Sequence, residues 1–128
     1  MNSLQRVLCV EDEPDIRSVI KLALEAVGGF SVLLCNSGKE AIEKAPAFAP
    51  DFILLDAMMP GMDGPSTLKA LREIPALANV PVAFMTAKVQ TSEIAGFKAL
   101  GALDVIAKPF NPRTLADTVK SIWERRNG

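Results

Sequence analysis

The chain has 128 residues, of which 49% are hydrophobic and 23% charged, a composition typical of one soluble globular domain with a proper core. Its 14 Lys and Arg side chains against 15 Asp and Glu give a net charge of −1, which provides no electrostatic footprint for nucleic acid or an anionic membrane. The absence of histidine excludes histidine-based catalysis, a histidine-ligated metal and a phosphohistidine carried by this chain.

Strand-like apolar runs alternate with helical patterns along the chain. Pro14 opens the first helical stretch, which stops at the glycine pair 28–29, and Ser37 with Glu40 forms a capping box before the second. Asn111 and Pro112 are expected to make the N-cap and first turn of the last helix. The predicted strands cover residues 6–10, 30–35, 51–56, 80–86 and 104–108, and the intervening helices cover 38–47, 66–73 and about 92–101.

This alternation predicts an α/β fold in which one doubly wound, five-stranded parallel sheet is covered by helices on both faces. Strands such as DFILLD are apolar on both sides, as in buried parallel sheets. Right-handed crossovers then leave few strand orders. The sequence has no internal repeat, low-complexity tract or linker, so residues 1–128 are expected to form a single domain.

The cysteines and the apolar runs bear on location. Cys9 and Cys35 lie in strand-like runs and are expected to be buried free thiols, which fits a reducing cytoplasm. The apolar runs are too short to cross a bilayer, and the first residues, MNSLQRVLCVEDE, lack a signal-peptide pattern. We therefore expect a cytoplasmic protein that makes no membrane contact.

Polar residues follow the ends of four predicted strands. Glu11 and Asp12 come after the first strand, Asp56 ends the third, Thr86 ends the fourth and Lys108 ends the fifth. Because parallel strands point the same way, these ends share one edge, where open α/β sheets bind their ligands. The sequence therefore predicts one pocket built from all five residues.

The chemistry of this pocket favours a hard cation. Its three carboxylates would repel one another, and burial would push some of them towards protonation. A divalent ion together with Lys108 relieves that repulsion. Since the available ligands are oxygens, with no histidine and no suitably spaced cysteine, the expected ion is Mg²⁺, with Mn²⁺ as a substitute.

Each of these residues, taken alone, has a plainer explanation. An acidic pair after a strand can simply favour a helix N-terminus, and Thr86 can be an ordinary β-branched strand residue. Lys108 can be a solvated surface lysine. Asp56 is the strongest single candidate because FILLD followed by a glycine-containing turn exposes it at a strand tip. One shared pocket is favoured over these separate explanations, because they would require polar groups to end four strands by coincidence.

The segments VEDE, LLDAMMPGMDG, MTA and KPF, in this order and spacing, resemble receiver domains of two-component response regulators, in particular the chemotaxis-type single-domain regulators. The resemblance covers essentially the whole chain. It implies a flavodoxin-like fold of five parallel strands in the order 2-1-3-4-5 with five helices.

The resemblance also implies a metal site. Asp12 and Asp56 would bind Mg²⁺ directly, and the backbone carbonyl of Met58 would supply a third protein oxygen. Glu11 would reach the ion through water.

The phosphoryl chemistry is implied in the same way. Asp56 would accept a phosphoryl group from a phosphohistidine on a sensor histidine kinase or a histidine phosphotransfer protein. Thr86 would hydrogen-bond a phosphoryl oxygen, and Lys108 would pair with Asp56 and then with the phosphoryl group. The Lys108–Pro109 peptide bond is expected to be cis. The domain would act only on itself, through its own phosphorylation and dephosphorylation.

Two positions bear on the lifetime of the phosphoryl group. In the family, the side chains two residues after the phosphorylated aspartate and two after the threonine flank the path of the attacking water. Here they are Met58 and Lys88. Met58 can only screen the water, whereas Lys88 can contact the phosphoryl group, so hydrolysis is expected to be no faster than in receivers with polar groups at both places.

The expected output surface departs from the family at Val105. Many receivers carry an aromatic ring there that swings inward on phosphorylation, but a β-branched valine is too small and too restricted to do so. We therefore expect a shift of the helix around residues 92–100. The docking surface for a downstream protein or a second copy of the chain would be that helix, the fifth strand and the fifth helix. Phe97 and Trp123 are candidates for it, although both could equally belong to the core.

Three other functions fit the sequence less well. Haloacid-dehalogenase-type phosphatases carry a second acid two residues after the nucleophile, whereas Asp56 is followed by Ala-Met-Met. An interaction module that works without phosphorylation would not need all five pocket residues. A nucleotide-binding domain would carry a G-x-G-x-x-G loop, and this chain has none.

The domain organisation leaves two expectations open. Only WERRNG follows the last predicted helix, so a complete product would signal by docking. A fragment would have its effector domain beyond Gly128.

Overall fold

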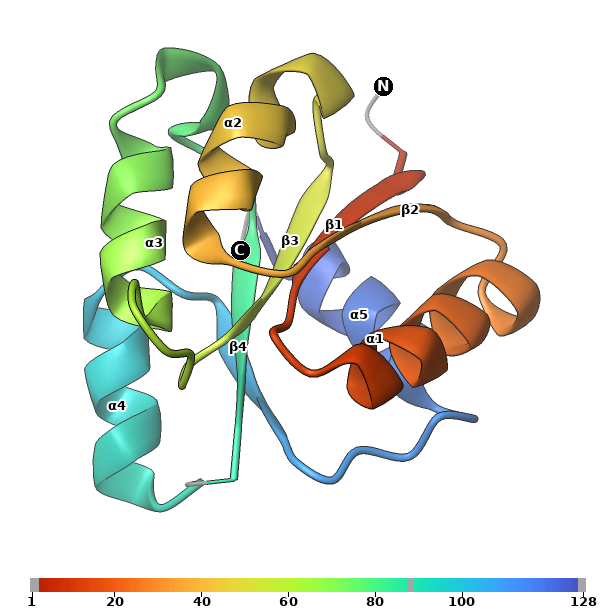
Figure 1. Ribbon diagram of the computed structural model, residues 1–128. Helices are drawn as coiled ribbons and strands as arrows, with labels where there is room; N and C mark the ends of the chain where they lie inside the picture. The colour runs from red at the N-terminus through yellow and green to blue at the C-terminus, as the bar shows by residue number, and fades with distance from the viewer. Residues whose placement is uncertain (1–2, 88, 127–128) are drawn as a thin grey trace.

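The computed structural model describes residues 3–87 and 89–126, which form one sheet of five parallel strands in the order β2-β1-β3-β4-β5 (Figure 1). The predicted fold class and strand order are confirmed. Each strand lies within two residues of its predicted bounds. The strands are β1 Arg6–Val10, β2 Ser31–Cys35, β3 Phe52–Asp56, β4 Val82–Thr86 and β5 Asp104–Ala107.

Helices cover both faces of the sheet, with α1 and α5 on one face and α2, α3 and α4 on the other (Figure 1). The first helix continues from α-helical into π-helical geometry before it ends at the predicted glycine pair. The helical elements are α1 Pro14–Lys21, η1 Leu22–Val27, α2 Gly38–Phe48, α3 Gly64–Arg72, η2 Pro75–Leu77, α4 Thr91–Ala99 and α5 Leu115–Glu124. No helix among the described residues has the length and apolar character needed to cross a membrane.

The two core layers follow from the alternation of side chains along the strands. Val7 and Cys9 of β1 pack into the α1–α5 layer, while Leu8 and Val10 pack into the α2–α3 layer. All five residues of β3 are buried, which explains why this central strand has so few polar residues before its last position. The sheet therefore holds Asp56 on a strand that is packed on both sides.

The two cysteines are free and buried, as predicted. They lie on adjacent strands but belong to opposite core layers, Cys9 beneath α1 and α5 and Cys35 beneath α2. Burial raises the pKa of the Cys35 thiol to about 11 and that of Cys9 further still. Both thiols behave as small hydrophobic groups.

Local capping explains where two helices begin. Ser37 Oγ accepts a hydrogen bond from Glu40 N at 3.1 Å, as the capping box predicts, but the Glu40 carboxylate accepts from Asn36 N instead of Ser37 N. The third helix begins two residues before its predicted start because Asp63 caps it, accepting from Ser66 N at 2.8 Å.

The predicted start of the last helix is wrong. Asn111 does not cap it: Asn111 Oδ1 accepts from Arg113 N, only two residues on, and the Asn111 carbonyl accepts from Thr114 N. These bonds close a separate turn that includes Pro112. The helix α5 therefore begins at Leu115, the first residue of this segment that packs into the core.

Candidate functional site

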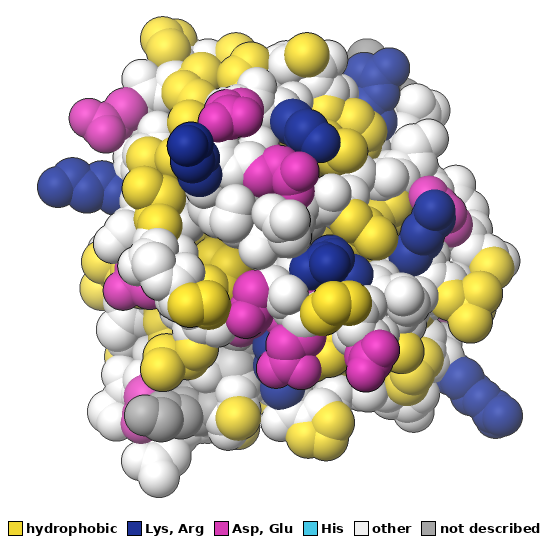
Figure 2. All heavy atoms as spheres, in the orientation of Figure 1, with side chains coloured by type: hydrophobic (Ala, Val, Ile, Leu, Met, Phe, Trp, Pro, Cys, Tyr) yellow, Lys and Arg dark blue, Asp and Glu magenta, His cyan; other side chains and the backbone are white. Residues whose placement is uncertain are grey.

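The carboxyl edge of the sheet brings together acidic groups from two strands. Glu11 and Asp12 lie directly after β1, and Asp56 is the last residue of β3. One carboxylate oxygen from each of these three residues lies within 4.8 Å of the other two. In the space-filling view, acidic side chains gather on the part of this face where the chain passes from β1 to α1 in Figure 1 (Figure 2). The three acids predicted to lie together at this edge of the sheet do so.

Lys108 joins this cluster from the end of β5. Its Nζ lies 2.7 Å from Glu11 Oε1 and 3.2 Å from Asp56 Oδ1, so one ammonium bridges two carboxylates. The Lys108–Pro109 peptide bond is cis, as predicted. Lys108 therefore faces the cluster and is not a solvated surface lysine.

Burial and charge shift the protonation of this group. Asp56 is 3% exposed and Glu11 is completely buried. Burial, with a further contribution from the charge of Glu11, raises the pKa of Asp56 to about 6 against the lowering effects of Lys108 and the Met58 N–H. Burial acts to lower the pKa of Lys108. The hydrogen bond to Glu11 and the charges of Asp56 and Glu11 outweigh burial, so the pKa of Lys108 lies above its ordinary value.

The loop after β3 and the end of β4 complete the edge. Met58 N donates to Asp56 Oδ1 at 3.3 Å, and the Met58 side chain is 68% exposed. Thr86 is buried, and its carbonyl accepts from Lys108 N at 2.9 Å, which ties the ends of β4 and β5 together. Asp56 pairs in register with Met85, so Thr86 lies one residue beyond it. Lys88 lies outside the described residues.

The donor set fits a hard divalent cation. Three carboxylates face a single ammonium, which leaves about two negative charges uncompensated in a largely buried site. Glu11 Oε1 faces Lys108 without a second, well-aligned donor among the described residues. All of these groups offer oxygen, which suits Mg²⁺ or Mn²⁺. In the part of the chain that the structure describes, no other group of three acids is close enough to hold an ion.

One residue of the site was not identified from the sequence. Arg17 Nη1, on α1, donates to the carbonyls of Glu11 at 2.8 Å and of Asp12 at 2.9 Å. The available signal was a basic residue one turn into the helix that follows the acidic pair. Such a residue is common on helices, and nothing in the sequence shows that it turns back to the loop.

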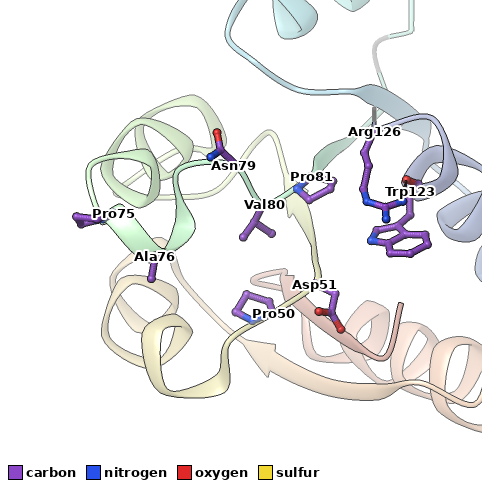
Figure 3. Close-up of a pocket in the computed structure, with 9 residues that line it drawn as sticks. All are labelled: Pro50, Asp51, Pro75, Ala76, Asn79, Val80, Pro81, Trp123 and Arg126. Carbon is purple, nitrogen blue, oxygen red and sulfur yellow. Dashed lines mark hydrogen bonds between the residues drawn. The ribbon is translucent and has the colours of Figure 1, made fainter. Parts of the chain in front are cut away.

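A separate cavity lies at the opposite, amino-terminal edge of the sheet and has a different character (Figure 3). Trp123 and Arg126 form one wall, where the guanidinium carbon lies 3.5 Å from the ring centroid, and Pro50, Val80 and Pro81 form the other. Trp123 therefore lies near the end of α5, at the amino-terminal edge of the sheet.

Phe97, the other aromatic candidate for the docking surface, points inward. Its ring lies 4.7 Å from the ring of Phe84 in β4, with the planes tilted by 37°. The Phe97 side chain packs against the α2–α3 core layer. It therefore links α4 to the sheet and does not form part of an exposed docking face.

The comparison with known proteins identifies the family. The chain matches the sequence model of the response regulator receiver domain over residues 7–120, and it therefore belongs to this family of signalling domains. It is 36% identical over 121 residues to the alkaline phosphatase synthesis transcriptional regulatory protein PhoP of Bacillus subtilis, covering 94% of this chain and 49% of PhoP.

Two further comparisons agree. The DNA-binding response regulator MtrA of Mycolicibacterium smegmatis is 33% identical over 121 residues, covering 94% of this chain and 51% of MtrA. The chain thus spans about half the length of these curated relatives. A solved structure of the Vibrio cholerae chemotaxis protein CheY4 has a TM-score of 0.87 and 32% identity, covering 94% of this chain and 99% of that one.

Proposed function

We propose that this receiver domain accepts a phosphoryl group on Asp56 in a Mg²⁺-dependent reaction and thereby switches a protein-docking surface. The observation that carries the proposal is the position of Asp56, a buried carboxylate at a strand tip, 3.2 Å from the Lys108 ammonium and within an acidic cluster. The donor would be a phosphohistidine on a sensor histidine kinase or a histidine phosphotransfer protein. The domain would act on itself alone and not turn over other substrates.

Asp56 is suited to be the nucleophile. One of its oxygens attacks phosphorus while the phosphorus–nitrogen bond of the donor breaks. The donor imidazole is the leaving group, and Asp56 becomes an acyl phosphate. An ionised carboxylate needs no general base from the protein. Lys108 is already in contact with Asp56, so it can follow the charge onto the phosphoryl oxygens, and the Thr86 hydroxyl would donate to one of them.

The acidic cluster would hold the metal ion. Asp12 and Asp56 would be direct ligands with the Met58 carbonyl, and Glu11, which is completely buried and paired with Lys108, would act through water. When bound, Mg²⁺ supplies charge neutralisation for the transferring group. The observed excess of carboxylates over cations supports this assignment.

An apolar groove next to the site supports a helical donor partner. Ile16 and Val19 of α1 and the Pro109–Phe110 segment form its walls, and Ala87 and Lys108 connect it to the pocket. Its volume is about 450 Å³. Because Lys108 lines the groove and also contacts Asp56, an amphipathic helix that covers the groove would bring its phosphohistidine close to Asp56.

The output surface is proposed to be α4, β5 and α5, which would bind a downstream protein or a second copy of the chain. No residue of α4 is buried, although the structure describes all of it, and Val105 is only half-buried. A weakly held helix is the element most easily shifted by a change at the end of β4. We propose that residues 1–128 form one receiver domain that binds no nucleic acid itself. The relatives described as DNA-binding are about twice as long as the part that this chain matches, which favours an effector domain elsewhere in a longer protein.

The test is labelling with acetyl phosphate or a phosphorylated histidine donor. We expect about one phosphoryl group per chain, dependent on Mg²⁺, and none in Asp56→Asn. The exposed Asp117 on α5, which does not belong to the acidic cluster, provides a matched control, and Asp117→Asn should label as the wild type does. Full labelling of Asp56→Asn would overturn the proposal, and continuous turnover of small phosphate esters would indicate a phosphatase.

A further inference from the structure

The Arg17 side chain contacts the backbone of the loop that carries Glu11 and Asp12. The side chain leaves α1 one turn after the helix begins and turns back, and its Nη1 donates to two successive carbonyls, those of Glu11 and Asp12. The two distances, 2.8 and 2.9 Å, are those of well-formed hydrogen bonds. A single guanidinium nitrogen carries two protons, so it can serve both acceptors at once.

These bonds complete the restraint of the short junction between β1 and α1. On one side, Glu11 N donates to Cys35 O at 3.0 Å, which extends the β1–β2 ladder. Glu13 N donates to the Glu11 carboxylate at 3.2 Å, and the N-cap residue Glu13 makes no side-chain cap of its own. Arg17 is thus what connects the helix to the carbonyls on the far side of the loop.

The orientation of these carbonyls decides where the two acidic side chains point. Fixing these two carbonyls restrains the backbone dihedral angles of residues 11 and 12, which set the directions in which the Glu11 and Asp12 side chains leave the loop. Arg17 also places a positive charge beside a loop that carries uncompensated negative charge. Both effects hold the acidic pair in the arrangement that a metal ion needs.

We propose that Arg17 is a positioning residue of the metal site, which acts through the backbone of residues 11 and 12 and touches neither the ion nor the phosphoryl group. The metal part of this inference rests on the proposed function. The restraint of the loop by Arg17 does not rest on the proposed function, because it concerns hydrogen bonds of the metal-free protein.

The experiment compares Arg17→Met with Lys21→Met. Methionine keeps the length of the arginine stem and removes its donors and its charge. Lys21 lies on the same helix one turn further on, is exposed, and loses the same charge on substitution. Two quantities are measured on each folded protein: the dissociation constant for Mg²⁺ alone, by calorimetry, and the exchange rate of the Glu13 amide without metal, by NMR.

For Arg17→Met we expect Mg²⁺ binding to weaken by about tenfold or more, the usual effect of losing a partner that orients metal ligands. The Glu13 amide should exchange at least about tenfold faster, because its hydrogen bond depends on the orientation of the loop. Lys21→Met should match the wild type in both. Arg17→Lys keeps the charge but not the planar pair of donors, so its Mg²⁺ affinity and Glu13 exchange rate should lie between those of the wild type and Arg17→Met. It replaces Arg17→Met in the experiment if that variant does not fold.

Different failures have different meanings. If wild-type protein binds no Mg²⁺, the metal assignment fails, while Glu13 exchange still tests the loop restraint. If Arg17→Met, or Arg17→Lys in its place, keeps the wild-type Mg²⁺ affinity and wild-type Glu13 exchange, the role of Arg17 is overturned. A loss of thermal stability with unchanged Mg²⁺ affinity overturns it as well, because a purely structural arginine would behave in that way.

Discussion

Lys108 lies closer to Glu11 than to Asp56: its Nζ is 2.7 Å from Glu11 Oε1 and 3.2 Å from Asp56 Oδ1. In the metal-free protein, the Lys108 ammonium therefore pairs more closely with Glu11 than with Asp56. Glu11 also raises the pKa of Asp56 directly, through its own negative charge. The protonation of Asp56 thus depends on a residue that comes from a different strand.

Glu11→Gln should lower the pKa of Asp56. The substitution removes the like charge and leaves Lys108 with Asp56 as its remaining charged partner, and both changes favour the ionised carboxylate. Because burial is the largest cause of the shift, the pKa should fall from about 6 but remain above its ordinary value of 3.8. Titration of the Asp56 carboxyl carbon by NMR measures this directly. An unchanged or higher pKa would show that Glu11 does not act on Asp56.

Asp56→Asn should stabilise the metal-free protein above pH 6. The folded pKa of Asp56 is raised to about 6, so the stability that this group contributes is fully present below about pH 4 and is lost as pH rises through about 6. The asparagine variant avoids this loss and should gain about 1–3 kcal/mol in free energy of unfolding at pH 7. Urea denaturation at pH 4 and pH 7 with a chelator tests the sign. A variant that is less stable than wild type at pH 7 would contradict it.

Met58→Asn should accelerate loss of the phosphoryl group. Met58 is exposed beside the site and can only screen the attacking water, whereas an amide can hydrogen-bond it. One added hydrogen bond of about 1.4 kcal/mol in the transition state corresponds to about tenfold in rate. The decay of labelled protein after removal of the donor gives the rate constant. Met62, exposed on the same loop, provides the control, since Met62→Asn should leave the rate unchanged. An equal or slower decay in Met58→Asn would contradict the screening role.

A beryllium fluoride adduct should perturb α4. Thr86 lies two residues after Phe84 on β4, and Phe84 stacks against Phe97, so a pull on Thr86 reaches α4 through this aromatic pair. We expect amide chemical-shift changes from residues 92–106 as well as around the site. In Phe97→Leu, which keeps an apolar side chain but removes the ring, the changes in α4 should shrink while those near Asp56 persist. Perturbations confined to the site in the wild type would mean that this face does not carry the signal.

Much of this arrangement was predictable from local patterns. The alternation of apolar runs and helical segments determines the α/β class, because buried parallel strands and amphipathic helices have different periodicities. Glu11, Asp12, Asp56 and Lys108 could be assigned to one edge because parallel strands end on the same side. Their oxygen-rich chemistry followed from residue type alone. The strand order and the cis Lys108–Pro109 bond came from the family resemblance.

Only the tertiary structure decided which side chains meet across these elements. The choice of Glu11 as the nearer partner of Lys108 and the inward direction of Phe97 depend on packing between segments distant in sequence. The return of Arg17 to the carbonyls after β1 depends on how α1 lies against that loop. The start of α5 at Leu115 was missed for the same reason. A turn and a cap use the same residue types, and burial against the sheet determines where the helix begins.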